Sequence, residues 1–380
     1  MPPDAPAGPY LVVEWSGGGG LGHYAFLLAD ALARARPDVT LVTRRGFELG
    51  DAPRAHRVVT PWRAAPAWRR GPLRSAAVGA ARIAGWFHVC RVVLRSRDAH
   101  PIVHLQGIDR SPEILFGALL RLMGATVIVT LHNAVPHDSG RVRRATQAVA
   151  LRIPHGFIAH TADVRSEIRR HRGSRAPVRV LPHPTYRRLA EVGDDGGGIV
   201  RGRRLRIGAF GMIRPYKGLE FVVRAVGVLA GGEPPVEFRV VGRPGDREWA
   251  ESLLATLAPG TVSQRLEYVP LPDLVREIRS ADLLLLGHRS SSESGIAQLA
   301  LGAGVPVIAP RTGALATLLA TRAEWLYEPG DLDDAVERTR RVLGDLSRDR
   351  GGLRSAALEG ADGAPSWEEM AREGLLLAEE

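Results

Sequence analysis

One segment of the chain places two cations on a turn between a predicted strand and a predicted helix. Lys217 is the only lysine among the 51 lysine and arginine residues, and Arg214 lies three positions before it. Lysine carries a compact charge that suits a single phosphate oxygen, whereas arginine presents a wide planar fork. Two such cations could flank one diphosphate and stabilise a departing nucleotide. We therefore predict that Gly211, Arg214 and Lys217 bind an anionic ligand; the alternative is an arginine-rich chain that kept one lysine by chance.

A glycine-rich loop, Ser16-Gly-Gly-Gly-Gly-Leu-Gly-His23, follows the first apolar strand and opens a helix. The loop fits the G-x-G-x-x-G pattern of dinucleotide-binding proteins. That pattern also requires an acidic residue about 20 positions later, at the end of the second strand, where this chain has Arg44 and Arg45. Two arginines could accept a phosphorylated ribose, so a dinucleotide phosphate enzyme stays open as an alternative. The more general prediction is a loop whose backbone, at Gly19, Gly20 and Gly22, lies close to bound phosphate or sugar.

A serine-rich loop precedes a helix of small residues and a buried strand, in the segment from Ser290 to Pro310. The backbone amides of Ser294 and Gly295 lie at the predicted start of that helix. Amides at a helix start attract anions, because they form the positive end of the helix dipole. We therefore predict a second anion contact here, with Glu293 as the nearest acid, although helix capping alone would also account for the serines.

Polar residues also follow two predicted strands in the first half of the chain. Gln106 follows Ile102–Leu105, and the segment Thr130–Asp138 ends the next strand. A lone histidine is more often structural, but two histidines and an aspartate at one strand end favour a functional site. His132 lies nearest the strand end, where a histidine can exchange a hydrogen bond with a reacting hydroxyl. The candidate residues are Gln106, His132, Asn133, His137 and Asp138.

The elements that must position these residues alternate between strand and helix. Apolar runs such as Tyr10–Trp15, Leu205–Phe210 and Leu266–Val269 are separated by stretches with helical spacing, which is typical of parallel sheets covered on both faces. We predict an α/β fold with two doubly wound Rossmann-like domains, which bind ligands beyond the strand ends, in the cleft between the domains. The predicted parts are residues 1–190, a linker 191–204, residues 205–364, and a C-terminal helix 365–380 that crosses back to the first domain.

Composition narrows the class of protein. A chain of 380 residues with 45% hydrophobic residues is long enough for two packed domains. No apolar run reaches the roughly 18 to 20 residues that cross a bilayer, and the N-terminal residues lack the features of a signal peptide. The single cysteine, Cys90, excludes an internal disulfide and a cysteine-based zinc site, and it fits a reducing cytosol.

The net charge of +10 and the pI near 10.7 indicate anionic partners. Arginines are concentrated between Trp62 and Arg97, together with Trp68, Trp86 and Phe87. Basic residues with such aromatic residues suit the surface of an anionic membrane. A core helix with a solvated arginine face is an equal alternative. We expect no nucleic acid partner.

Together these segments resemble retaining glycosyltransferases of the GT-B fold, close to glycosyltransferase family four. The resemblance covers nearly the whole chain and is strongest from Leu205 to Leu315, which holds the Arg214 and Lys217 turn and the Gly304-Val-Pro-Val run. In that family the arginine and the lysine hold the donor diphosphate, and the N-terminal glycine loop lies at the junction of donor and acceptor. The loop that begins at His132 looks like the acceptor-side loop of related enzymes.

One departure concerns two glutamates that usually precede the Gly-x-Pro-Val run in the family. The aligned positions here are Ser291 and Leu299, and Glu293 lies two residues off that register. In similar members of the superfamily, helix-start amides such as those of Ser294 and Gly295 are expected to take over the phosphate contacts. No residue is assigned to the ribose.

The resemblance implies a retaining hexosyltransferase that moves a sugar from a UDP- or GDP-linked donor to a hydroxyl acceptor. The acceptor is expected to be lipid-linked or a polysaccharide precursor, and the enzyme to be cytoplasmic and peripheral on the inner face of the plasma membrane. Arg214, Lys217 and His132 are the expected catalytic residues, without a metal ion or another cofactor. Two alternatives are a nucleotide-sugar epimerase of the same fold and a non-catalytic nucleotide-sugar binder.

Overall fold

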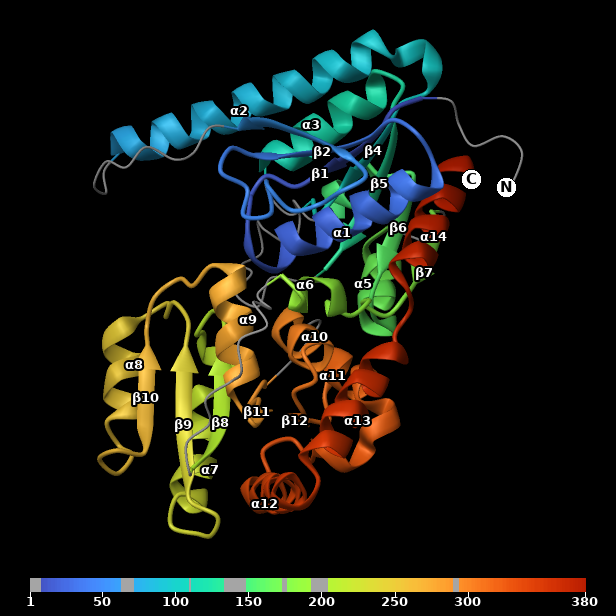
Figure 1. Ribbon diagram of the computed structural model, residues 1–380. Coiled ribbons are helices and arrows are strands. Elements are labelled where there is room, and N and C mark those ends of the chain that lie inside the picture. Colours follow the sequence, from blue (N-terminus) through green and yellow to red (C-terminus); the bar gives the residue numbers. More distant parts are fainter. Residues whose placement is uncertain are drawn as a thin grey trace. The chain divides into compact units, whose positions relative to one another are not determined.

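The computed structural model describes residues 8–62, 72–108, 111–132, 148–172, 176–192, 204–289 and 294–380. The chain forms two compact units, each with alternating strands and helices (Figure 1). The first unit comprises Met1–Leu181 and Ser366–Glu380, and the second unit comprises Pro182–Pro365.

The sheet of the first unit has seven strands in the order β3-β2-β1-β4-β5-β6-β7, and every pairing is parallel. Strand β1 lies inside the sheet and pairs with both neighbours, so Tyr10 lies opposite Val39 on one side and Ile102 on the other. The strands are β1 (Tyr10–Val13), β2 (Val39–Arg44), β3 (Arg57–Trp62), β4 (Ile102–Leu105), β5 (Thr126–Leu131), β6 (Gly156–Ala159) and β7 (Val178–Val180).

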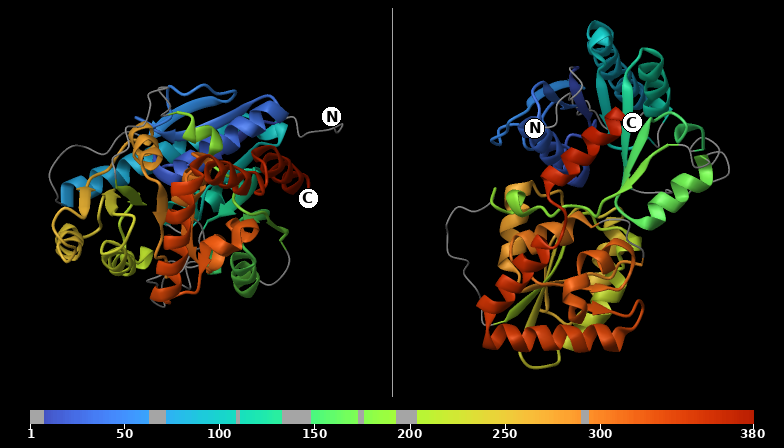
Figure 2. Two further views of the ribbon diagram at one scale, coloured as in Figure 1. Left: turned by 60° about the horizontal axis from the view of Figure 1, so that its bottom comes forward. Right: turned by 90° about the vertical axis from the view of Figure 1, so that its right-hand side faces the viewer.

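Helices cover both faces of this sheet (Figure 2). α2 (Pro72–Arg95) and α3 (Ser111–Leu122) lie together on one face, where Trp86 and Phe116 stack with ring centroids 5.5 Å apart. α1 (Gly19–Ala35) and the C-terminal α14 (Trp367–Glu379) pack together on the other face, and α5 (Ala162–Arg172) follows β6. The C-terminal helix therefore belongs to the first unit.

The sheet of the second unit has six strands in the order β10-β9-β8-β11-β12-β13, again all parallel. The prediction of two doubly wound Rossmann-like sheets is confirmed. The strands are β8 (Leu205–Phe210), β9 (Val236–Val241), β10 (Val262–Arg265), β11 (Leu283–Leu285), β12 (Val307–Pro310) and β13 (Leu326–Tyr327). The helices are α6 (Arg187–Ala190), α7 (Leu219–Leu229), α8 (Arg247–Leu254), α9 (Leu271–Ser280), α10 (Gly295–Gly302), α11 (Gly313–Leu318), α12 (Leu332–Arg348) and α13 (Arg350–Asp362).

Several boundaries of domains, strands and helices differ from those predicted. The units divide at Leu181 and not at residue 190, because α6 packs against α10 of the second unit. The predicted strand Leu266–Val269 is wrong: the strand is β10, and Leu266 and Val269 are buried in the connection to α9. Helix α1 begins at Gly19, so part of the glycine loop is its first turn. Most of the linker 191–204 lies outside the described residues.

Two of the aromatic residues expected at a membrane surface, Trp62 and Trp86, belong instead to the core of the first unit, whereas Phe87 is exposed. Trp62 is 2% exposed and Trp86 is 1% exposed, and their rings meet edge to face at 5.6 Å. Gly85 makes room for Trp62, because a Cβ there would lie 2.1 Å from the indole nitrogen. Trp68 lies outside the described residues. In the part of the chain that the structure describes, no helix is both long and apolar enough to span a bilayer.

Candidate active site

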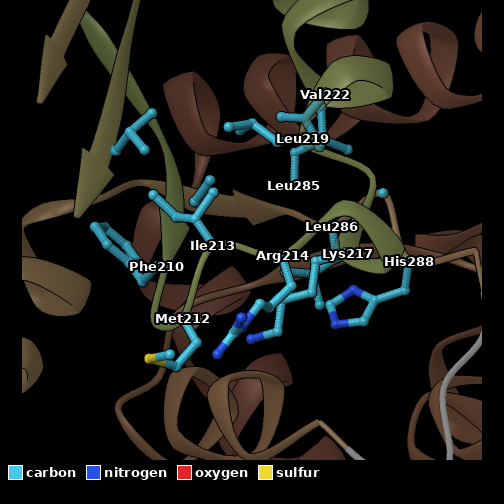
Figure 3. A pocket seen from close by; sticks show the side chains of 13 residues that line it. Phe210, Met212, Ile213, Arg214, Lys217, Leu219, Val222, Leu285, Leu286 and His288 are labelled. Atoms are coloured by element: carbon cyan, nitrogen blue, oxygen red, sulfur yellow. The ribbon is translucent and has the colours of Figure 1, made fainter. Parts of the chain in front are cut away.

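The second unit brings the predicted anion-binding cations to the switch point of its sheet, between β8 and β11. Arg214 and Lys217 follow β8, and His288 follows β11. The three side chains lie side by side in one pocket, which the apolar residues Met212 and Leu286 also line (Figure 3). Connections from these two strands leave in opposite directions, so the carboxyl edge is open to a ligand here.

Close backbone contacts fix the turn that carries Lys217. Gly218 has a φ of 65°, and a Cβ there would lie 1.8 Å from the Gly287 carbonyl oxygen. A Cβ at Gly242 would lie 1.7 Å from the Gly211 carbonyl oxygen. The turn after β8 is thus packed against the ends of both neighbouring strands, and no other residue type fits at Gly218 or Gly242 without a shift of the backbone.

The charges of Arg214 and Lys217 are not neutralised by an acid in the described parts of the chain. Burial of the Lys217 ammonium, reinforced by repulsion from Arg214, lowers the pKa of Lys217 to about 8. Lys217 is still mainly charged at pH 7. Two uncompensated cations in one pocket favour an anionic ligand, because such a ligand would relieve their repulsion.

His288 belongs to this pocket and is absent from the sequence prediction. It is 4% exposed, and its Nδ1 has no hydrogen-bond partner among the described residues. Burial, followed by the charge of Lys217, lowers the pKa of His288 to about 3, so the imidazole is neutral. The available signal was a histidine three residues past the buried strand β11, which is weaker than the signal for His132, directly after β5.

The start of α10 lies next to the turn after β8. A Cβ at Gly211 would lie 3.8 Å from Lys217 Nζ and 3.9 Å from Ile296 Cδ1, so Gly211 sits between the cation and the first turn of α10. Ser294 is the N-cap, yet its side chain makes no capping hydrogen bond, and its buried Oγ has no partner among the described residues. Capping therefore does not explain Ser294. Gly295 starts the helix, and Glu293 lies outside the described residues.

In the first unit, two of the candidate residues meet at the carboxyl edge of the sheet. His132 follows β5 and its Nε2 lies 3.1 Å from Oε1 of Gln106, which follows β4. Burial lowers the pKa of His132 to about 3, so its ring is neutral. The buried Nε2 of Gln106 has no partner in the described structure and is available to a ligand. Asn133, His137 and Asp138 lie outside the described residues.

Two carboxylates organise the glycine loop. Glu14 accepts hydrogen bonds from the amides of Ser16 at 2.6 Å and Gly17 at 2.9 Å. Glu48 accepts from the Gly19 amide at 3.3 Å and lies 2.9 Å from His23. These carboxylates occupy loop amides that a dinucleotide pyrophosphate would need, so the loop does not fit that alternative.

Packing does not explain two of the loop glycines. A Cβ added at Gly19 or Gly20 would meet no atom within 4 Å, whereas a Cβ at Gly22 would lie 3.3 Å from the Phe47 ring. Gly19 has a φ of 66°, which accounts for that glycine by backbone conformation. Gly20 has neither reason, and its predicted role beside a ligand stays a prediction.

Two family comparisons match most of the chain. Residues 19–184 match the family described as "Glycosyl transferase 4-like domain", and residues 204–345 match "Glycosyl transferases group 1". A GDP-mannose:glycolipid 4-beta-D-mannosyltransferase from Xanthomonas campestris pv. campestris is 30% identical over 57% of this chain and 60% of its own length. A D-inositol 3-phosphate glycosyltransferase from Nocardia farcinica is 32% identical over 39% of this chain and 35% of its own. The match thus spans about three fifths, or less, of these relatives.

Solved structures share the whole fold. Sucrose-phosphate synthase from Thermosynechococcus elongatus superposes with a TM-score of 0.73 at 17% identity, covering 98% of both chains. HepE from Anabaena, solved in complex with UDP and glucose, superposes with a TM-score of 0.70 at 17% identity, over 97% of this chain and 99% of HepE. At such low identity these likenesses show the fold alone, with two Rossmann-like domains.

Proposed function

Because the chain belongs to the GT-B glycosyltransferases, we propose that it transfers a hexose from a nucleotide diphosphate donor to a hydroxyl of a lipid-linked acceptor. The observation that carries the proposal is the pocket with Arg214 and Lys217, two cations without an acidic partner in the described structure. In this proposal the pair holds the donor diphosphate, and the first-turn amides of α10 add a further contact. Neutral His288 offers a hydrogen bond to the same ligand.

The X. campestris relative supports a finer choice of substrates. Its name specifies GDP-mannose as donor and a glycolipid as acceptor. We therefore propose a GDP-linked hexose and a glycolipid acceptor for this chain, with a UDP-linked hexose as the competing donor. A lipid-linked acceptor would also bring the protein to the inner face of the plasma membrane.

The proposed reaction retains the configuration at the sugar C1. The bond between C1 and the diphosphate oxygen breaks, and the diphosphate leaves with the electron pair toward Lys217 and Arg214. The acceptor oxygen bonds to C1 on the same face and gives its proton to the leaving oxygen. His132 orients the acceptor hydroxyl, since its neutral ring can exchange a hydrogen bond with it.

Inversion is the second candidate, and the name of the same relative favours it. That enzyme forms a β-linkage from GDP-mannose, whose mannose is α-linked, so its product has the opposite configuration. Inversion here would need a base for the acceptor proton, and His132 would be the first candidate. The one-bond coupling constant between C1 and H1 of the transferred sugar, measured by NMR, distinguishes retention from inversion. An inverted product would rule out the retaining path.

We also propose that the two cations replace a metal ion at the diphosphate. Lys217 and Arg214 together supply two positive charges at the pocket. Turnover is then expected to be unchanged by EDTA. Loss of activity with EDTA and recovery with Mg²⁺ would contradict this part of the proposal.

A thermal-shift screen of nucleotides and nucleotide sugars tests the proposed function. A bound donor raises the unfolding temperature by mass action, so GDP, UDP or their sugars should stabilise the wild-type protein and not the Lys217→Ala variant. An epimerase would alter the donor sugar without any acceptor, and a non-catalytic binder would be stabilised without turnover. Absence of stabilisation by every nucleotide diphosphate would refute the donor site.

Donor affinity should fall as the pH rises through the pKa of Lys217, which is about 8. The protonated lysine attracts the diphosphate, and deprotonation removes that attraction, so the dissociation constant increases by up to about tenfold per pH unit above the pKa. Calorimetric titration of GDP between about pH 6.5 and pH 9.5 measures this. Lys217→Ala is the control and should show a weak, nearly pH-independent affinity; an equally flat wild-type profile would contradict the assignment.

His132→Ala should separate acceptor chemistry from donor binding. We expect turnover to fall on the order of 100-fold, because a positioned proton-exchanging group is lost, while the nucleotide dissociation constant stays within about twofold of the wild-type value. The Lys217→Ala variant is the reciprocal control, since it should lose nucleotide affinity. A large loss of nucleotide affinity in His132→Ala would place His132 on the donor side instead.

A further inference from the structure

Helices α2 and α3 expose apolar side chains to solvent at helical spacing. On α2, Ile83 is 45% exposed, Phe87 61% and Leu94 52%. On α3, Leu115 is 66% exposed and Leu122 85%, and Leu119 lies between them at 37%. Helices of a soluble core normally turn such stripes inward. Here the inward stripes are also present, since Trp86, Val89 and Val93 of α2 are buried in the core.

The two exposed stripes form one surface. α2 and α3 lie beside each other on the same face of the first sheet (Figures 1 and 2). Phe87 of α2 bridges them, because its ring contacts Phe116 of α3 edge to face at 5.7 Å. We call the surface formed by Ile83, Phe87, Leu94, Leu115, Leu119 and Leu122 the α2/α3 surface. A contiguous apolar surface of this kind marks contact with a membrane or a partner protein.

The charges around the α2/α3 surface are positive. Arg91 and Arg95 of α2 are exposed, and no ion pair or hydrogen bond to either occurs among the described residues. The sequences of the two helices contain a single acid, Glu113, which is 4% exposed. An anionic bilayer complements both features at once, because its acyl boundary accepts leucine and phenylalanine while its headgroups attract arginine.

We propose that the α2/α3 surface docks the protein on an anionic lipid bilayer, with Leu115, Leu119, Leu122, Phe87 and Leu94 at the acyl boundary and Arg91 and Arg95 at the headgroups. This docking serves the lipid-linked acceptor and in that respect rests on the proposed function. Its residues agree only in part with those expected from the sequence: Phe87, Arg91 and Arg95 lie in the predicted segment, whereas Trp62 and Trp86 are core residues and the leucines of α3 are added. Attachment itself needs neither donor nor acceptor, so it can be measured independently of catalysis.

Sedimentation of the full-length protein with vesicles tests the proposal. Vesicles of phosphatidylcholine and phosphatidylglycerol should bind the wild-type protein at low salt, and vesicles of phosphatidylcholine alone should bind it at least about tenfold more weakly. Leu115→Gln with Leu122→Gln should weaken partitioning to the anionic vesicles at least about tenfold, because two leucines no longer enter the acyl boundary. Arg91→Gln with Arg95→Gln should weaken it and reduce its salt dependence.

Matched variants elsewhere on the chain provide the controls. Val228→Gln with Leu376→Gln removes two apolar side chains that are 48% and 41% exposed outside the α2/α3 surface, and it should bind like wild type. Arg340→Gln with Arg348→Gln is the charge control. Thermal unfolding of each variant should match wild type, since all these side chains are exposed.

Three results would overturn the proposal. The first is equal binding to anionic and neutral vesicles, and the second is equal loss of binding in the α2/α3 and control variants. The third is a wild-type dimer in sedimentation velocity that becomes a monomer in Leu115→Gln with Leu122→Gln, without vesicle binding; the surface would then dock a second copy. Loss of glycosyl transfer with intact vesicle binding would instead count against the proposed function alone.

Discussion

Replacing Lys217 by alanine should reduce turnover at least about 100-fold, which corresponds to on the order of 3 kcal/mol of transition-state stabilisation. The ammonium lies in the pocket beside Arg214, and negative charge grows on the diphosphate as it leaves. No acidic residue in the described structure forms an ion pair with Lys217, so the unfolding temperature of the variant should barely change. Steady-state kinetics with a saturating donor, together with thermal unfolding, measures both effects.

Lys217→Arg is the informative companion variant. Arginine keeps the charge but needs more room than the compact ammonium. Space around the ammonium is limited, because a Cβ built at Gly211 would lie only 3.8 Å from Lys217 Nζ. We therefore expect Lys217→Arg to recover only part of the lost rate. Arg340→Ala, which removes an exposed cation from α12, is the control and should retain full activity. Unchanged activity in Lys217→Ala would remove Lys217 from the catalytic site.

The sequence predicted the two sheets because parallel strands buried on both faces are short apolar runs, such as β4 and β8, whose bounds agree with the prediction. It failed where that signal is weak. β10 is partly exposed along Val262–Arg265, so the apolar residues Leu266 and Val269 after it gave a false strand. β3 and β13 were missed, because β3 contains arginine and proline at an edge of the sheet and β13 has only two residues.

The candidate site was predictable where residue type and strand position coincide. Arg214 and Lys217 follow a clear apolar strand, and the structure places them in one pocket. His288 was missed because it lies three residues past the short strand β11, and its neutral state depends on burial that only the fold creates. The α2/α3 surface was predicted only in part, with Phe87 of α2 but without the leucines of α3, for a related reason. Tryptophans between arginines are a poor guide to exposure, since a large aromatic side chain is as readily taken into the core.

Substituting Gly218 by alanine should destabilise the second unit by at least about 3 kcal/mol. Two costs add. A residue with a Cβ in the left-handed conformation costs roughly 1–2 kcal/mol, and the new Cβ would lie 1.8 Å from the Gly287 carbonyl oxygen, so the backbone must move. The backbone can move at Gly218, after β8, or at Gly287, after β11. Each of these glycines is next to a pocket residue, since Lys217 precedes Gly218 and His288 follows Gly287. Activity should therefore fall together with stability.

Gly260→Ala separates the two costs, because both glycines have a positive φ and differ in their surroundings. Gly260 has a φ of 77°, but a Cβ there would meet no atom within 4 Å. This variant should lose only the conformational cost of roughly 1–2 kcal/mol, and it should keep its nucleotide affinity. Calorimetric unfolding and titration of the nucleotide into both variants test the comparison. Equal destabilisation of Gly218→Ala and Gly260→Ala would show that the contact with Gly287 does not hold the Lys217 turn in place.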